Sequence, residues 1–140
     1  MDRCHKLVRR YDVTSASVHD SQVVDDILDD DNTASGVWAD SAYRSAEIEA
    51  KLAQKGLKSR IHRKAKRGKP LGKHEKRGNT SRSRVRSRVE HVFGSQHNDM
   101  GGTLVRCIGM ARAKARVGLK NLTYNMRRLT LLDRLQAAPT

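Results

Sequence analysis

The stretch Asn79–Gly94, NTSRSRVRSRVEHVFG, carries four arginines at every second position, followed by a single carboxylate, Glu90. In a helix, Arg82, Arg86 and Glu90 stack on one face at four-residue spacing, and valines form an apolar stripe beside them. We therefore predict a helix that packs by one face and presents charge on another. Two interpretations of Glu90 stay open: an ion pair with Arg86 worth ~0.3–0.5 kcal/mol at an exposed surface, or a functional carboxylate.

Charge is distributed unevenly along the chain. The 140 residues include 29 Lys and Arg against 15 Asp and Glu, a formal net charge of +14. Residues 55–90 hold 15 basic and 2 acidic side chains, whereas residues 1–54 hold 6 and 11. We expect a polyanionic partner, with nucleic acid first. Aromatic residues make up only 4%, so contacts to a charged backbone are a better expectation than stacking on single-stranded bases.

Several classes of protein are disfavoured by composition. Cys4 and Cys107 are far apart and form no CxxC pair, so neither a disulfide framework nor a zinc finger is expected, and a reducing compartment fits. No stretch approaches the roughly 18–20 apolar residues that span a bilayer, and the N-terminus lacks the apolar core of a signal peptide. Nucleotide hydrolases of the P-loop type and serine hydrolases are also disfavoured, because neither GxxxxGK[ST] nor GxSxG occurs in the sequence. We expect a cytoplasmic protein with no membrane partner.

The N-terminal region predicts a strand followed by a helix. Residues 5–13, HKLVRRYDV, are rich in branched and aromatic side chains and favour a strand. Because a strand that begins so close to Met1 must pair with something, we expect the chain to be truncated. Apolar residues at helical spacing then predict a helix over about 20–29, with a solvated acidic outer face.

Asp40 ends the next predicted strand, GVWAD at 36–40, and precedes an amphipathic helix that runs to about Gly56. Active groups of open α/β sheets lie at the carboxyl ends of strands, which makes Asp40 a candidate functional residue. The alternative is that Asp40 only caps the following helix. Residues 57–62 predict another short strand.

Residues 63–79 predict a mobile basic loop, because glycines and prolines stand among lysines and arginines. Its use would be to neutralise phosphates, and the alternative is a targeting-like or solubilising charge run. The candidate DNA-binding residues are the cations of this loop and the helix after it: Arg63, Lys64, Lys66, Arg67, Lys69, Arg82, Arg84 and Arg88.

A long C-terminal helix is predicted from Met110 onward, with a kink near Gly118 and a frayed tail at 136–140. Its apolar stripe is more typical of a core than of an interface, so no dimer is inferred from it. The stripe comprises Val117, Leu122, Met126, Leu129 and Leu132.

Strands alternating with helices favour an α/β layer architecture in which Asp40 and Glu90 are the acids best placed for chemistry. Clustered carboxylates can hold two Mg²⁺ ions for phosphoryl transfer, although two acids alone make a thin site. The six histidines show no zinc-ligand spacing with the cysteines, and we interpret them as structural or close to phosphate.

Four runs in a fixed order resemble the C-terminal part of the catalytic domain of insertion-sequence transposases of the DDE class. They are DVTSASVHDSQV, VWADSAYRS, RSRVRSRVEHVFG and NLTYNMRRL, and the resemblance covers nearly the whole chain. It implies an RNase H-like α/β fold, here a partial domain over 1–135 with N-terminal strands missing. It also implies two aspartates and a glutamate that bind Mg²⁺ or Mn²⁺, cleavage and joining of DNA at transposon ends, and a homo-oligomer in the intact enzyme.

By this resemblance Asp40 matches the second aspartate of the family, and Glu90 matches its glutamate. Arg86 matches the arginine of the tyrosine-arginine-glutamate signature, whereas Ser83 stands where that signature has tyrosine. Asp40 and Glu90 would bind metal, and Arg86 would orient Glu90 or touch phosphate. Nothing in the chain matches the first aspartate.

The expectation is therefore a transposase remnant, or one reading frame of a split element, near the bacterial nucleoid and inactive alone. The rival interpretation is a non-catalytic basic DNA- or RNA-binding protein in which the loop does the binding and the acids are structural.

Overall fold

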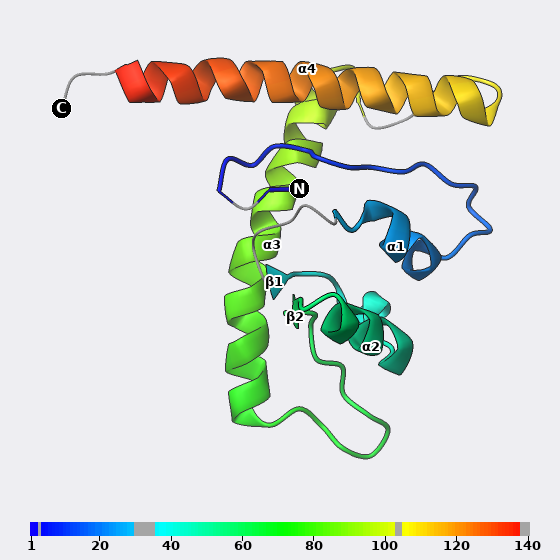
Figure 1. The fold of residues 1–140 in the computed structure, drawn as a ribbon, viewed down its shortest axis with the longest axis vertical. Coiled ribbons are helices and arrows are strands. Elements are labelled where there is room, and N and C mark those ends of the chain that lie inside the picture. Colours follow the sequence, from blue (N-terminus) through cyan, green and yellow to red (C-terminus); the bar gives the residue numbers. More distant parts are fainter. Residues whose placement is uncertain (3, 30–35, 103–104, 138–140) are drawn as a thin grey trace. The chain divides into compact units, whose positions relative to one another are not determined.

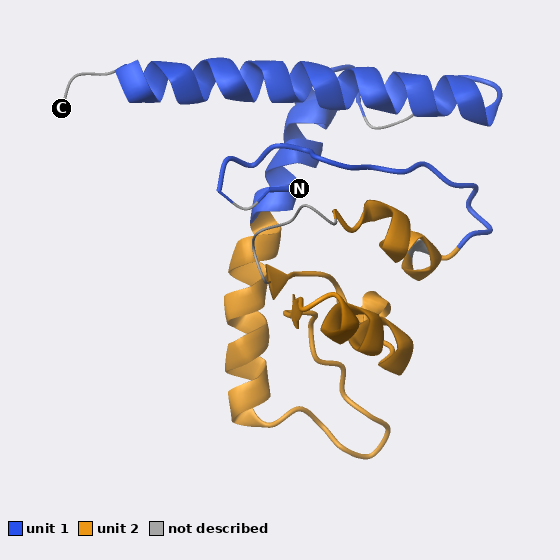
Figure 2. Cartoon of the chain, in the orientation of Figure 1, with its two compact units in different colours: residues 1–18, 88–140 blue, residues 19–87 orange. Residues whose placement is uncertain are grey.

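A computed structural model describes residues 1–2, 4–29, 36–102 and 105–137 of the chain. The described residues form an α/β structure with helices and one small parallel sheet, which confirms the predicted α/β class. Two compact units divide the chain (Figure 2): unit 1 comprises residues 1–18 and 88–140, and unit 2 comprises residues 19–87.

Unit 2 holds the sheet and most of the short elements. In chain order these are η1 (Asp20–Val23), α1 (Val24–Ile27), β1 (Gly36–Val37), η2 (Ser41–Tyr43), α2 (Ala46–Gln54) and β2 (Lys58–Ser59). Strands β1 and β2 lie side by side in parallel, with Gly36 opposite Lys58 (Figure 1). Both predicted strands are confirmed but shorter, and the helix expected over 20–29 is a 3-10 turn that continues into one α-helical turn.

The core of unit 2 lies between α2 and the two strands. Its buried residues are Ile48, Leu52 and Ile61, and the last two are only 1% and 2% exposed. The hydroxyl of Ser45 caps α2 by accepting a hydrogen bond from the Ile48 backbone N–H at 3.1 Å. Because Ile48 and Leu52 are four residues apart, this helix turns both side chains to the same face. The connection from β1 through α2 to β2 thus packs as one helix against two parallel strands.

Helix α3, Lys73–Asp99, confirms the helix predicted over 79–94 and extends it at both ends. The prediction of a loop over 63–79 is wrong for its last seven residues, because α3 begins at Lys73. A carboxylate oxygen of Glu75 accepts from the Gly72 N–H at 3.2 Å, and an acid in the first turn stabilises a helix start. The basic loop therefore comprises residues 63–72.

The strand predicted over 5–13 is wrong, because these described residues form no strand. Side chains of helix α4, Met110–Ala137, bond to the backbone of His5 and Val8 instead. Asn125 accepts from the Val8 N–H at 2.9 Å and donates to the Val8 carbonyl at 2.8 Å, while the Arg128 Nε–H donates to the His5 carbonyl at 2.8 Å. One side-chain amide thus reproduces locally the donor and acceptor pair that a neighbouring strand would offer.

Helix α4 confirms the predicted C-terminal helix, and it continues through Gly118 without interruption. A Cβ at Gly118 would collide with the hydroxyl of Tyr11, so the glycine permits a close approach rather than breaking the helix. Gln136 and Ala137, expected to fray, belong to α4, and residues 138–140 lie outside the described part.

The interpretation of the α4 stripe as core is wrong for its central residues. Leu122 and Met126 are 55% and 61% exposed, and Leu129 is exposed as well. Asn121 and Tyr124 are the residues of this helix that are buried. The buried face of α4 is therefore rotated away from the stripe that hydrophobicity alone selects.

A buried amide pair supports unit 1. The Gln96 Nε2–H of α3 donates to Asn121 Oδ1 of α4 at 2.7 Å. We expect Asn121→Ala to lower the free energy of unfolding by about 1–3 kcal/mol, because the Gln96 amide then lacks its partner. Denaturant unfolding followed by circular dichroism would measure the loss. Asn98→Ala, at an exposed position of α3, is the control and should stay within about 0.5 kcal/mol; equal losses in both variants would contradict the prediction.

Candidate functional site

Asp40 lies just beyond β1, at the carboxyl end of that strand. Its Oδ1 accepts a hydrogen bond from the Ser41 N–H at 2.5 Å, and its carbonyl accepts from the Tyr43 N–H at 3.1 Å. Asp40 is thus the N-cap of the 3-10 turn η2, and the alternative that it caps the following amphipathic helix is wrong, because Ser45 caps α2. The cap uses one carboxylate oxygen.

Arg86 approaches the other oxygen of Asp40. Its Nη1 lies 3.4 Å from Asp40 Oδ2, and the two side chains are 34% and 47% exposed. The hydrogen bond from the Ser41 N–H lowers the pKa of Asp40 below its ordinary value, and the charge of Arg86 acts in the same direction against partial burial. The carboxylate is therefore ionised at neutral pH and can only accept hydrogen bonds or bind cations. Two residues selected from separate motifs, Asp40 and Arg86, meet in unit 2.

His62 joins this pair without having been singled out from the sequence. Its Nδ1 lies 3.5 Å from Arg86 Nη1, and its Nε2 lies 3.4 Å from Ser83 Oγ. The backbone N–H of His62 donates to the Ala39 carbonyl at 3.1 Å, which extends the ladder between β1 and β2. His62 could have been found only from the parallel register of the two strands. The hydrophobic periodicity of a single sequence does not specify that register.

Glu90 lies four residues after Arg86 in α3 and is exposed. It belongs to unit 1, whereas Asp40 and Arg86 belong to unit 2. Carboxylate oxygens suit a hard divalent cation. Among the residues that the structure describes, however, no group of three or more His, Cys, Asp or Glu side chains could hold a metal ion. The donor chemistry of Asp40 fits such a cation, but the described residues do not form a complete metal site.

The cations of the basic loop are exposed. They are Arg63, Lys64, Lys66, Arg67 and Lys69, and a turn closed by the Lys69 N–H and the Lys66 carbonyl at 2.9 Å lies within them. Asn79 of α3 anchors the start of the loop, since its amide pairs with both backbone groups of Arg63 at 2.9 Å. A fixed start and exposed cations are suited to contact a polyanion.

Arg82 differs from Arg84 and Arg88, which are exposed. Its guanidinium donates to Asn79 Oδ1 at 2.9 Å and lies over Gly78, where an added Cβ would approach Nη1 to 3.3 Å. Burial lowers the pKa of Arg82, and the neighbouring charges act in the same direction; they are those of Arg63, Arg44 and Arg60. The guanidinium still remains charged at neutral pH. We call Arg82 and these three neighbours, Arg63, Arg44 and Arg60, the arginine cluster. It concentrates positive charge that a bound anion would neutralise.

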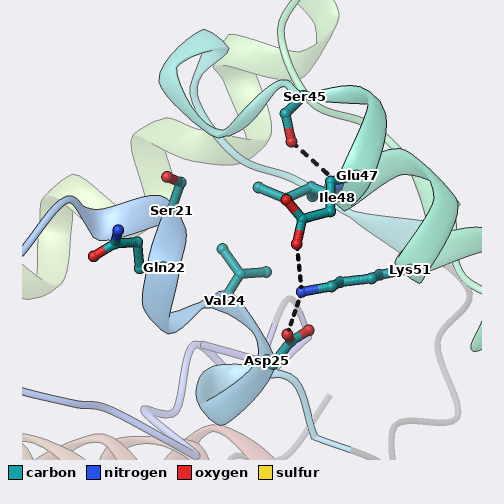
Figure 3. A pocket seen from close by; sticks show the side chains of 8 residues that line it. All are labelled: Ser21, Gln22, Val24, Asp25, Ser45, Glu47, Ile48 and Lys51. Carbon is teal, nitrogen blue, oxygen red and sulfur yellow. Dashed lines mark hydrogen bonds and ion pairs between the residues drawn. The ribbon is translucent and has the colours of Figure 1, made fainter.

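A cavity of about 380 Å³ lies elsewhere in unit 2 and carries no comparable chemistry (Figure 3). Lys51 Nζ is held there between Asp25 at 2.7 Å and Glu47 at 3.0 Å, and the hydrogen bond to Asp25 helps to raise the pKa of Lys51. Its charges are paired internally, and none of the predicted site residues lines it. The lining residues are Ser21, Gln22, Val24, Asp25, Ser45, Glu47, Ile48 and Lys51.

The fold and site define a strongly basic α/β protein in which a strand leads to an ionised aspartate beside an arginine. The family model described as a transposase DDE domain matches residues 1–126. The chain therefore belongs to the DDE transposases of insertion sequences, which confirms the resemblance read from its motifs.

One curated relative is the transposase for insertion sequence element IS1106 of Neisseria meningitidis serogroup B. It is 30% identical over 125 residues, which are 89% of this chain and 43% of the relative. The chain thus spans less than half the length of this relative. No solved structure matches the chain. None of the described helices is long and apolar enough to cross a bilayer.

Proposed function

We propose that this chain forms part of an RNase H-like catalytic domain of an insertion-sequence transposase, over residues 1–135, and binds DNA at transposon ends. The observation that carries the proposal is the approach of Arg86 to Asp40 at 3.4 Å, at the carboxyl end of β1. The parallel strands and the helix between them are compatible with such a domain. By analogy with the family, a homo-oligomer is proposed for the intact transposase.

Asp40 and Glu90 are the proposed ligands of Mg²⁺ or Mn²⁺ in the cleavage and joining of DNA. When bound, such ions activate water or a 3′ hydroxyl and stabilise the leaving oxygen. The chain's own residues prepare the site: Ser41 holds one oxygen of Asp40, and Arg86 neutralises the other or contacts a DNA phosphate. Since the resemblance assigns two of three acids, we expect the 140-residue chain to bind DNA without cleaving it.

DNA contacts are proposed for the basic loop and for the arginines of α3. The exposure of the loop cations and the excess positive charge of the arginine cluster, in which Arg44 is paired with Glu49 at 3.4 Å, support this role. The same observations favour a second candidate, a non-catalytic basic protein that binds DNA or RNA and uses its acids only structurally. Both candidates bind nucleic acid in a salt-dependent way, so DNA binding does not separate them.

Binding of Mn²⁺ to the isolated chain separates the two candidates. We expect Asp40→Asn and Glu90→Gln each to weaken binding by more than about tenfold, because each removes a charged oxygen ligand. Titration followed by electron paramagnetic resonance would measure free Mn²⁺ directly. Asp133→Asn, at an exposed position of α4, is the matched control and should bind as the unmodified chain does. Unchanged affinity in both acid variants would favour the non-catalytic protein.

A further inference from the structure

We propose that His62 is a positioning residue that holds the Arg86 guanidinium against Asp40, through the contacts of its Nδ1 with Arg86 and its Nε2 with Ser83. The resemblance assigns no role to this histidine. The geometry of the contact concerns unit 2 alone. The importance of this positioning for catalysis rests on the proposed function of Asp40 and Arg86. The positioning itself does not rest on that function.

The backbone fixes where His62 lies. Beyond the paired residues of β1 and β2, the ladder continues with the Arg60 N–H donating to the Val37 carbonyl at 2.7 Å and the His62 N–H donating to the Ala39 carbonyl at 3.1 Å. Ile61, the residue before His62, is buried in the core. Successive side chains of an extended segment point to opposite faces, so burial of Ile61 turns His62 to the face opposite the core.

Helix α3 supplies both partners of the imidazole. Ser83 and Arg86 are three residues apart, a spacing that puts them on one face of the helix. Arginine has donors and no acceptor, so the Nδ1 that faces Arg86 must accept. The proton of the neutral ring therefore resides on Nε2, where it can be donated to Ser83 Oγ. One tautomer satisfies both contacts, and Arg86 selects it, because a serine hydroxyl can either accept or donate.

Arg86 Nη1 consequently has two acceptors, His62 Nδ1 at 3.5 Å and Asp40 Oδ2 at 3.4 Å. Its two hydrogens can serve one acceptor each. An arginine side chain has many rotamers, and an ion pair to a half-exposed carboxylate restrains it weakly. A second acceptor on the adjacent strand segment restricts those rotamers, because both acceptors are fixed by the same backbone ladder. His62 thereby sets the direction in which Arg86 meets Asp40.

Nitrogen-15 NMR of the arginine side chains tests this role on the whole chain, with Arg86→Lys identifying the Arg86 signals. We expect slowed guanidinium rotation at Arg86 in the unmodified chain, loss of that slowing in His62→Ala, and its retention in His62→Asn, whose Oδ1 can replace Nδ1 as acceptor. Ser83→Ala should weaken the effect, because the ring loses the hydroxyl contact at Nε2 that helps to hold its orientation. His74→Ala, at an exposed position of α3, is the control and should leave Arg86 unchanged.

Identical Arg86 signals in His62→Ala and the unmodified chain would overturn the proposal. Equal loss in His62→Ala and His62→Asn, with an intact amide fingerprint, would overturn it as well, because a merely packed ring needs no acceptor. The Mn²⁺ titration reports separately on the proposed function. Asp40→Asn could leave the Mn²⁺ affinity unchanged while His62→Ala removes the slowing of Arg86 rotation. That result would support the positioning role of His62 and contradict the metal-binding role of Asp40.

Discussion

Replacing the five cations of the basic loop by glutamine is expected to flatten the salt dependence of DNA binding. The five residues are Arg63, Lys64, Lys66, Arg67 and Lys69, and all are exposed. Each phosphate contact releases about 0.9 counterion from duplex DNA, so the slope of log affinity against log salt should fall by up to about 4.5. Between about 50 and 200 mM salt, this slope corresponds to roughly 10²–10³-fold in affinity. Fluorescence anisotropy with labelled duplex DNA would measure it.

A control with the same change in net charge is available in the chain. Five exposed cations outside the loop can be replaced by glutamine together: Lys58, Arg106, Arg112, Arg116 and Arg134. We expect this variant to keep most of the slope, because diffuse charge steers DNA but does not neutralise particular phosphates. Equal loss of slope in both variants would show that net charge alone determines binding, and would remove the loop from the proposed interface.

Leu52→Ala is expected to lower the free energy of unfolding of unit 2 by about 2–5 kcal/mol. Leu52 is almost fully buried, and the core around it has only two other buried side chains among the described residues, Ile48 and Ile61. Removal of the isopropyl group of Leu52 therefore leaves a cavity that few neighbouring side chains can fill. Because a small unit is marginally stable, a loss of this size approaches its whole stability.

Fluorescence of Trp38 offers a specific measurement of this loss, since it is the only tryptophan of the chain and lies in unit 2. Urea unfolding of the variant should show a lower midpoint with a similar slope. Gln54→Ala, at an exposed position of the same helix, is the control and should change stability by less than about 0.5 kcal/mol. A midpoint of Leu52→Ala no lower than that of the control would mean that α2 does not hold the unit together.

The helices and strands that could be predicted from the sequence are those whose hydrophobic residues follow a regular local spacing. Hydrophobic spacing located α2, α3 and α4, and a short apolar run located β1. These elements follow from the periodicity of neighbouring side chains, which any reader of the chain can count. The start of α3 was predicted too late in the chain, because the glycines and lysines before Asn79 favour a loop. The hydrogen bond between Glu75 and the Gly72 N–H stabilises an earlier start of the helix.

The N-terminal segment shows a different limit. Branched residues over 5–13 favour an extended backbone, but propensity does not say which groups will accept and donate its hydrogen bonds. Asn125, more than a hundred residues away, takes the place of a neighbouring strand at Val8. The exposure of Leu122 and Met126 has the same origin, because the buried face of α4 is chosen by what packs on it.

For the candidate site, the motifs that resemble the transposase family selected Asp40, Arg86 and Glu90 as candidates from the sequence. The spacing of Cys4 and Cys107 did not favour a disulfide framework, and the structure has both as free cysteines. Only tertiary structure decided that Arg86 meets Asp40 and that His62 stands beside both. Those contacts join a strand end, a second strand and a helix. Their geometry depends on the register of two parallel strands and the rotation of a helix, and neither is encoded in the spacing of any one segment.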